Sequence, residues 1–161
     1  MQLRTATTAD IPELVRLRAV MLADLGTDPG GQDERWRRCA RTWFEQRIAG
    51  REDWTCLVAG AGPGGRLLAT GMAWETYHLP GPERADGRRG YIDGMVTDRP
   101  ARGMGHARRI VDALVAWLDS RGIRYVQLHA SPSGAPVYAA AGFTCARYPA
   151  MDLMTEQVGH Q

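Results

Sequence analysis

A turn of six residues, Arg102-Gly103-Met104-Gly105-His106-Ala107, carries the clearest chemical signal in the chain. It follows an apolar stretch and runs into a pattern with helical spacing, so it is predicted to lie at a helix N-terminus. A helix N-terminus presents backbone N–H groups without intrahelical partners and a partial positive charge. The glycines let a ligand approach this backbone closely, and the arginine adds charge-assisted donors. These properties suit an anion such as a pyrophosphate.

The spacing within the turn limits the kind of anion-binding loop. The lysine and the spacing of a Walker loop are missing, and no G-x-G-x-x-G opens a dinucleotide-binding unit. On these residues alone, three interpretations stay open: a turn that only caps a helix, a nucleotide-binding loop, and a loop for another pyrophosphate-bearing ligand.

A second segment, Val126–Phe143, reads VQLHASPSGAPVYAAAGF: a strand, a small polar turn, a short helix with Tyr138, and then Gly-Phe. Together with the R-x-x-G-x-A spacing from Arg102 to Ala107, it resembles motifs A and B of the Gcn5-related N-acetyltransferase (GNAT) superfamily. Two residues depart from the family pattern, since Ser131 stands where many members carry Asn and Gly134 where Ala is usual. The resemblance covers most of the chain, and its sharpest motifs lie between residues 95 and 143.

The elements that would position these motifs form an α+β pattern, in which two antiparallel hairpins precede a helix. The resemblance implies a GNAT-like mixed, mostly antiparallel central sheet, flanked by helices and split between the fourth and fifth strands. Strands are expected at Leu3–Ala6, Trp54–Ala59, Leu67–His78, Gly90–Thr97 and Tyr125–Ala130. Helices are expected from Thr8 to about Leu25, at Asp33–Ala49, after the loop to about Ser120, and at Ala135–Ala141. A last strand would begin at Gly142-Phe143, where Arg147–Met154 could pair with it.

Composition sets further limits on the class of protein. A chain of 161 residues predicts one domain over 1–155, followed by a flexible tail over 156–161. The net charge of +2 does not favour a nucleic-acid partner. The sequence has no apolar run of membrane length and no secretory signal, so a cytoplasmic protein without a membrane partner is expected. Cys39, Cys56 and Cys145 have neither disulfide-framework nor zinc spacing, and no metal site is predicted.

The resemblance implies acetyl-CoA as donor and an acetyltransferase that acylates a primary amine of a small molecule or a peptide directly. Because members of the family are often dimers, a homodimer is a further expectation. The implied cofactor-binding residues come from three segments: Met95, Val96 and Thr97 along the pantetheine arm; Arg102, Gly103, Met104, Gly105, His106 and Ala107 at the pyrophosphate; and Ser131, Ser133 and Tyr138 near the thiol.

The resemblance also implies that Tyr138 protonates the leaving thiolate, as a phenol with a pKa near 10 can do at neutral pH. The general base is open between Asp93 and Glu75, and Glu75 could instead bind a cationic acceptor. For His78 and His129 a structural role is favoured over catalysis. The apolar stripe that holds Trp36 and Trp43 is interpreted chiefly as core, although this segment walls the acceptor pocket in GNAT-like folds. A non-catalytic acyl-CoA-binding module is the alternative function, and the identity of the acceptor is not readable from the sequence.

Overall fold

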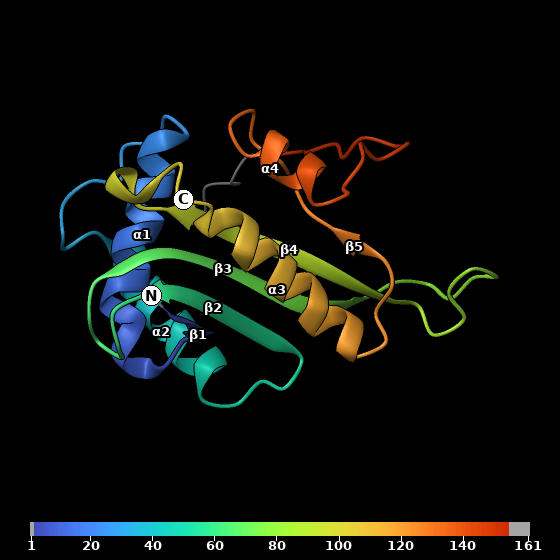
Figure 1. The fold of residues 1–161 in the computed structure, drawn as a ribbon, viewed down its shortest axis with the longest axis horizontal. Coiled ribbons are helices and arrows are strands. Elements are labelled where there is room, and N and C mark those ends of the chain that lie inside the picture. The colour runs from blue at the N-terminus through green and yellow to red at the C-terminus, as the bar shows by residue number, and fades with distance from the viewer. Residues whose placement is uncertain (1, 155–161) are drawn as a thin grey trace, which may run out of the picture.

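One five-stranded sheet runs through the computed structural model, which describes residues 2–154. Its strands lie in sequence order: β1 (Gln2–Thr5), β2 (Trp54–Gly60), β3 (Leu67–Tyr77), β4 (Arg88–Thr97) and β5 (Val126–Gln127). The first four pair antiparallel, and β5 pairs parallel to β4 (Figure 1). The predicted fold class, a mixed and mostly antiparallel sheet with flanking helices, is therefore confirmed.

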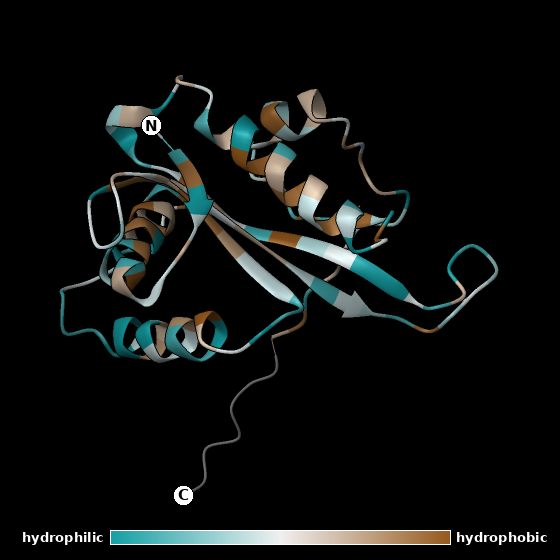
Figure 2. Ribbon diagram, turned by 60° about the horizontal axis from the view of Figure 1, so that its bottom comes forward, coloured by the Kyte–Doolittle hydropathy of each residue, from teal (hydrophilic) through white to brown (hydrophobic). Residues whose placement is uncertain are grey.

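Helices cover both faces of the sheet (Figure 2). They are α1 (Ile11–Asp24), α2 (Arg35–Ile48), α3 (His106–Ser120) and α4 (Ala135–Ala140), with short 3-10 turns at Thr8–Asp10 and Arg99–Ala101. The apolar faces of α1 and α2 bury one side of the sheet, and α3 buries the other through Ile110, Leu114 and Leu118. None of the helices within residues 2–154 is long and apolar enough to cross a membrane.

The N-terminus of α1 is fixed by a buried carboxylate. Asp10 is fully buried, and its side chain accepts hydrogen bonds from the amide of Thr7 at 2.8 Å and from the guanidinium of Arg4 at 2.7 and 2.8 Å. Burial alone would raise the pKa of Asp10, but the hydrogen bonds from Arg4, Thr7 and Gly64 outweigh it and lower that pKa. This contact ties β1 to the start of α1.

A bulge in β4 changes which of its side chains share a face. The register passes from Thr70 opposite Val96 to Met72 opposite Asp93, so two residues of β4 lie against Gly71 alone. One of them is Gly94, with φ +62°, where an added Cβ would lie 2.1 Å from Cε of Met72. The extra residue interrupts the alternation of the strand. As a result Asp93 and Val96 lie on the α1 side, whereas Met95 packs on the α3 side.

The sheet opens between β4 and β5. Gly90 pairs with Val126 and Tyr91 with Gln127, and no later residue of β4 has a partner on β5 within residues 2–154. The predicted strand Tyr125–Ala130 is therefore only two residues long, because its C-terminal half has left the ladder. The second half of β4, from Ile92 to Thr97, borders the split.

The prediction of a last strand is wrong. Residues 142–154 form no strand; the amide of Phe143 instead donates to the carbonyl of Tyr138 at 3.0 Å, closing the end of α4. A strand needs a ladder partner, and the two-residue β5 offers almost no edge. Downstream apolar side chains stay exposed, among them Met151 and Leu153. The predicted flexible tail, 156–161, lies outside the described residues.

Candidate active site

The loop between β4 and α3 combines open glycines with free backbone donors. Gly103 and Gly105 have φ values of +76° and +77°, and an added Cβ at either would meet nothing within 4 Å. The first helical hydrogen bond of α3 runs from Arg109 N to Gly105 O at 3.2 Å. The amides from Gly103 to Ala107 have no hydrogen-bond partner among residues 2–154. The sequence prediction of a ready anion-binding surface at this helix N-terminus thus has a geometric basis.

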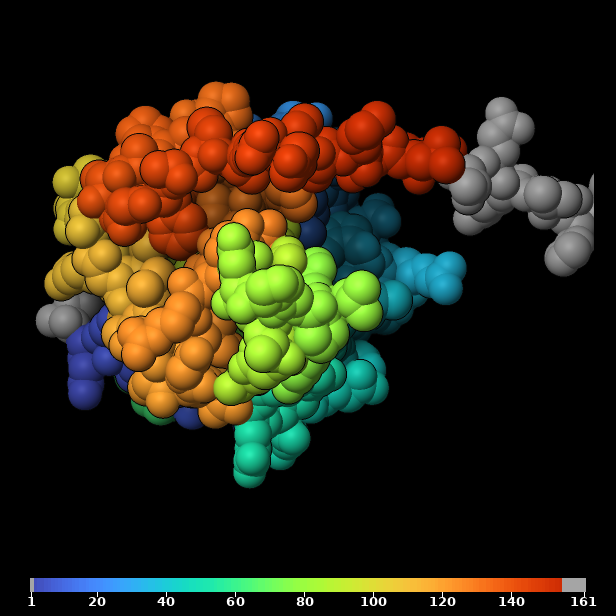
Figure 3. Space-filling model, turned by 90° about the vertical axis from the view of Figure 1, so that its right-hand side faces the viewer, coloured from blue at the N-terminus to red at the C-terminus, as the bar shows by residue number. Residues whose placement is uncertain are grey.

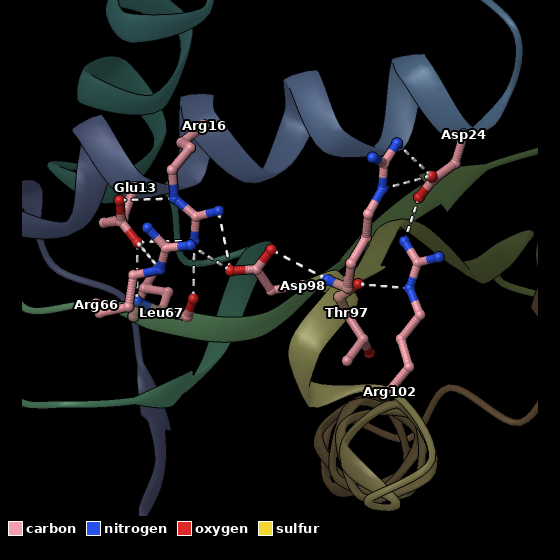
Figure 4. Close-up of polar contacts among 9 residues, drawn as sticks. Glu13, Arg16, Asp24, Arg66, Leu67, Thr97, Asp98 and Arg102 are labelled. Atoms are coloured by element: carbon pink, nitrogen blue, oxygen red, sulfur yellow. Dashed lines mark hydrogen bonds and ion pairs between the residues drawn. The ribbon is translucent and has the colours of Figure 1, made fainter.

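Helix α1 braces the start of this loop through two groups of ion pairs (Figure 4). Asp98, which is 5% exposed, accepts from Arg16 at 3.0 Å and Arg66 at 2.8 Å. Nearer the loop, Asp24 pairs with both Arg99 and Arg102. The Nε of Arg102 also donates to the carbonyl of Thr97 at 3.2 Å. The Arg102 guanidinium therefore holds the base of the loop to α1.

His106 contributes to the loop as a buried residue. Its side chain is 2% exposed, and Nδ1 lies 3.0 Å from Nη2 of Arg109. Burial, followed by the positive charge of Arg109, lowers the pKa of His106, so the imidazole is neutral at pH 7. Arginine can only donate, which places the imidazole proton on Nε2, and this atom has no partner among the described residues. Only the backbone amide of His106 is thus available to a ligand at the loop.

A cavity of about 400 Å³ lies on the other side of β4, between the sheet and helices α1 and α2. Its lining is mainly aromatic and apolar, with three polar side chains; the lining residues are Trp36, Trp43, Phe44, Trp74, Ala40, Met72, Arg18, Cys39 and Asp93. A size of this order and an apolar lining with few polar groups are usual for small-molecule sites.

The aromatic walls of the cavity are held in place by their neighbours. Trp36 Nε1 donates to the carbonyl of Pro29 at 2.9 Å. Trp43 packs edge-on against Phe44, with ring centroids 5.1 Å apart, and the guanidinium of Arg47 lies 3.7 Å from its ring centroid. The core interpretation of this stripe holds for Phe44, which is buried, whereas Trp36 and Trp43 pack against that core and also line the cavity.

Asp93 links the cavity to two tyrosines. Its carboxylate is exposed, and Oδ1 accepts from the amide of Gly94 at 2.6 Å. Burial, and next the negative charge of Asp93, raise the pKa of both Tyr91 and Tyr138. The hydroxyl of Tyr91 in turn lies 2.6 Å from Nδ1 of His129. The Asp93 carboxylate on β4 therefore lies close enough to both phenols to affect their pKa.

The side chains of Ser131 and Ser133 form hydrogen bonds within the turn before α4. Ser131 Oγ accepts from the amide of Gly134 at 3.2 Å and lies 3.2 Å from Ser133 Oγ, so both hydroxyls take part in the turn. The surroundings of Gly134 explain why glycine stands here in place of the alanine that is usual in the family pattern. A Cβ there would lie 3.0 Å from Cε2 of Tyr138 and 3.2 Å from Ser131 Oγ, so this glycine leaves room for the tyrosine ring.

Replacing Gly134 by Ala is expected to lower turnover about threefold, because the Tyr138 ring must move by a few tenths of an ångström and a displacement of 1 Å can cost about a hundredfold. Steady-state kcat measured beside Gly31→Ala, where an added Cβ meets nothing within 4 Å, provides the matched control. A variant as active as the wild type would show that the ring position is not critical.

Glu75 is not brought together with Asp93. Met72 and Trp74 of β3 line the cavity, so Glu75, one residue further along the strand, points to the α3 face. Its side chain is 3% exposed and pairs with Arg121 at 2.5 Å and Arg88 at 2.9 Å. Burial acts to raise the pKa of Glu75, but hydrogen bonds and charge from the two arginines lower it. The arrangement gives this carboxylate a bridging role between β3, β4 and the end of α3.

Among the cavity residues, the sequence did not single out Arg18, Met72 and Trp74. Trp74 reads simply as a strand residue, although its alternation with Met72 places both on one face. Arg18 interrupts the apolar stripe of α1, and a charge at such a position was the available signal. His78, by contrast, lies at the base of the β3–β4 loop and does not line the cavity. This loop extends from the end of the sheet in Figure 1 and faces the viewer in Figure 3, where it is light green.

Comparisons with known proteins agree with this arrangement. The sequence profile of the Acetyltransferase (GNAT) family matches residues 20–143. The chain is similar to glucosamine 6-phosphate N-acetyltransferase 1 of Oryza sativa subsp. japonica, with 32% identity over 142 residues, which cover 81% of this chain and 82% of that protein.

Solved structures with the same fold include a predicted acetyltransferase of Clostridium acetobutylicum, crystallised with acetyl-CoA. It has a TM-score of 0.80 and 28% identity, and the match covers 94% of this chain and 95% of that one. Glucosamine-6-phosphate N-acetyltransferase of Arabidopsis thaliana matches with a TM-score of 0.74 and 21% identity, covering 96% and 98%. At that identity the second likeness concerns the fold alone.

Proposed function

Because this chain belongs to the Acetyltransferase (GNAT) family, we propose that it transfers an acetyl group from acetyl-CoA directly to a primary amine. The observation that carries the proposal is the position of β4. Its C-terminal end leads into a loop of free amides at the N-terminus of α3, while Asp93 on the same strand lines a separate cavity. A donor site and an acceptor site therefore meet along one strand.

The loop fits the pyrophosphate of the donor. We propose that the amides of Gly103, Met104, Gly105, His106 and Ala107 bind its oxygens, because they are the unpaired donors at the N-terminus of α3. Arg102 then acts through the loop by holding its base to Asp24 and Thr97. This assignment accounts for the glycines, since any Cβ at Gly103 or Gly105 would stand in the open space before the amides.

The edge of β4 along the split fits the pantetheine arm. Val96 and Thr97 would bind it with backbone groups, in the manner of an added strand. The bulge leaves Met95 outside the regular register with β3. We assign the amide of Met95 to the carbonyl oxygen of the thioester, where a donor stabilises the charge that develops during attack. Ser131 and Ser133 would shape the turn that presents Tyr138 to the sulfur.

Two side chains then move protons. Asp93, directly or through water, takes a proton from the acceptor ammonium, and the free amine nitrogen attacks the thioester carbonyl carbon. A C–N bond forms, the C–S bond breaks, and the Tyr138 hydroxyl gives its proton to the departing sulfur. The acylated nitrogen then loses its extra proton, through water, to the Tyr138 phenolate, which restores the phenol, and Asp93 returns its proton to solvent. The raised pKa of Tyr138 keeps this proton on the phenol at neutral pH. Glu75 has no part in this scheme, because both its oxygens face arginines on the other side of the sheet.

The acceptor is proposed to be a small molecule. The similar rice protein is by name an N-acetyltransferase of a small amine, and the cavity has the size of a small-molecule site. A homodimer stays a prediction, which sedimentation analysis of the purified chain would check.

The proposed function is tested by calorimetric titration with acetyl-CoA and by thiol release across a panel of amines. Binding together with amine-dependent thiol release is expected. Binding without turnover on any amine would instead favour a non-catalytic acyl-CoA-binding module. Binding of ATP or NAD but not of CoA would overturn the donor assignment.

Asp93→Asn is expected to lower kcat/KM at pH 7 by about tenfold, which is less than the usual general-base effect of about 10² to 10⁴, because water can still accept the proton. Its rate should rise steeply toward high pH, since only the free-base fraction of the amine then reacts. The comparison is a pH–rate profile beside Asp119→Asn, an exposed carboxylate paired with Arg124 beyond the cavity. Superimposable profiles for Asp93→Asn and the wild type would place the base elsewhere.

A further inference from the structure

We infer that the acceptor is a primary amine on an aromatic or branched apolar body that also carries one carboxylate, and that it is not a sugar phosphate. This inference rests on the proposed function and adds the class of acceptor. It comes from the charges and the walls of the cavity between β4, α1 and α2, which favour a different acceptor from the one in the names of the similar rice and Arabidopsis proteins.

The walls select the body of the acceptor. Three tryptophans and Phe44 form the aromatic part of the lining, and Met72 and Ala40 complete its apolar part. The indole N–H of Trp36 is already bonded to the carbonyl of Pro29. The other polar groups of the lining are the side chains of Arg18, Cys39 and Asp93 and the indole N–H groups of Trp43 and Trp74. Each sugar hydroxyl enclosed here without a hydrogen-bond partner would weaken binding, whereas burial of an apolar ring against the same walls strengthens it.

The rings are held before any ligand arrives. Trp43 is fixed between Phe44, Trp54 and Arg47, and Trp74 packs on Tyr91 with ring centroids 5.2 Å apart. Tyr91 is in turn held by His129. Such preorganised walls strengthen binding of an apolar body, because little side-chain entropy of the protein is lost on binding.

The charges select the ends of the acceptor. Asp93 is the only carboxylate of the lining and Arg18 the only guanidinium, and neither forms an ion pair within residues 2–154. The nearest polar contact of Arg18 is a weak one, from Nη1 to the sulfur of Met21 at 3.8 Å. A ligand with one ammonium and one carboxylate would match both charges. A dianionic phosphate would meet a single guanidinium beside the Asp93 carboxylate and mainly apolar walls, which leaves most of its oxygens without charged donors.

The experiment compares matched amines with saturating acetyl-CoA. The pairs are para-(aminomethyl)benzoate against benzylamine and phenylalanine against 2-phenylethylamine, which place the carboxylate far from or next to the amine. Glucosamine 6-phosphate is the fifth acceptor. Thiol release gives kcat/KM, and quenching of tryptophan fluorescence gives the affinity of each amine for the protein loaded with CoA.

In at least one pair, the carboxylate is expected to raise kcat/KM about tenfold, the equivalent of one charge-assisted hydrogen bond. Glucosamine 6-phosphate should be at least about tenfold poorer than the better aromatic acceptor. Arg18→Gln should bring the ratio within that pair to about one, while Arg38→Gln, on an exposed arginine of α2, should preserve it.

Two results would overturn the inference while leaving acetyl transfer intact: glucosamine 6-phosphate as the best acceptor, or no carboxylate preference in either pair. Failure of the proposed function looks different, since no amine would then release thiol. In that case the fluorescence titration still decides the matter, because Arg18-dependent binding of the carboxylated amine supports the inference and its absence refutes it.

Discussion

Replacing Gly105 by Val is expected to abolish measurable binding of acetyl-CoA. Gly105 has a φ of +77° and precedes the first residue of α3. A β-branched side chain disfavours that conformation strongly, so the loop must change course or the side chain must stand before the free amides. Loss of only two hydrogen bonds to a charged pyrophosphate, at about 1.5 kcal/mol each, lowers affinity by about a hundredfold.

The chain offers a matched control at the other end of the same helix. Gly122 has a φ of +79°, lies after the last turn of α3, and has nothing within 4 Å of an added Cβ. Gly122→Val should therefore carry a similar backbone strain of about 1–2 kcal/mol but leave affinity for acetyl-CoA near the wild-type value. Calorimetric titration of both variants, with thermal unfolding as a check on folding, separates strain from ligand contact. Equal affinities in the two variants would remove the pyrophosphate assignment.

The sequence was most informative where local rules decide the structure. The loop after β4 needs glycines at left-handed positions and ends in a helical pattern, so its place at a helix N-terminus could be predicted from residues 96–118. The buried face of α3 is equally local, because Ile110, Leu114 and Leu118 follow one another at helical spacing. These features depend on neighbours in the chain, which the sequence shows directly.

Features that depend on distant partners could not be predicted in the same way. Glu75 and Asp93 looked equivalent as bases, because a strand residue does not reveal which face of the sheet holds the cavity. The β4 bulge at Gly94 and the pairing of Glu75 with Arg121 decide this, and both depend on tertiary contacts. The predicted last strand is absent from residues 142–154 for a related reason. Its sequence could form a strand, but β5 provides almost no edge for it to pair with. Arg18 lines the cavity because α1 packs against the sheet, and this tertiary contact cannot be read from the sequence.

Tyr138→Phe is expected to give the largest loss of turnover among the variants. General acids contribute about 10² to 10⁴ in rate, so kcat should fall by at least about a hundredfold if the phenol protonates the departing sulfur. Affinity for acetyl-CoA should change little, because the ring and its edge-on packing on Phe143, at 6.1 Å between centroids, are preserved. Tyr148→Phe, at a tyrosine that is 77% exposed, is the matched control.

The pH dependence of the rate provides an independent test of the acid role of Tyr138. An acid must be protonated to act, so the wild-type rate should fall as pH rises through the pKa of Tyr138. Burial and the charge of Asp93 raise this pKa, which places the loss above the ordinary value of about 10. Asp93→Asn removes the second of these causes, so it should move the high-pH loss to lower pH. If Tyr138→Phe kept the wild-type kcat, or if Asp93→Asn left the high-pH limb where it was, the proton on the departing sulfur would have to come from solvent.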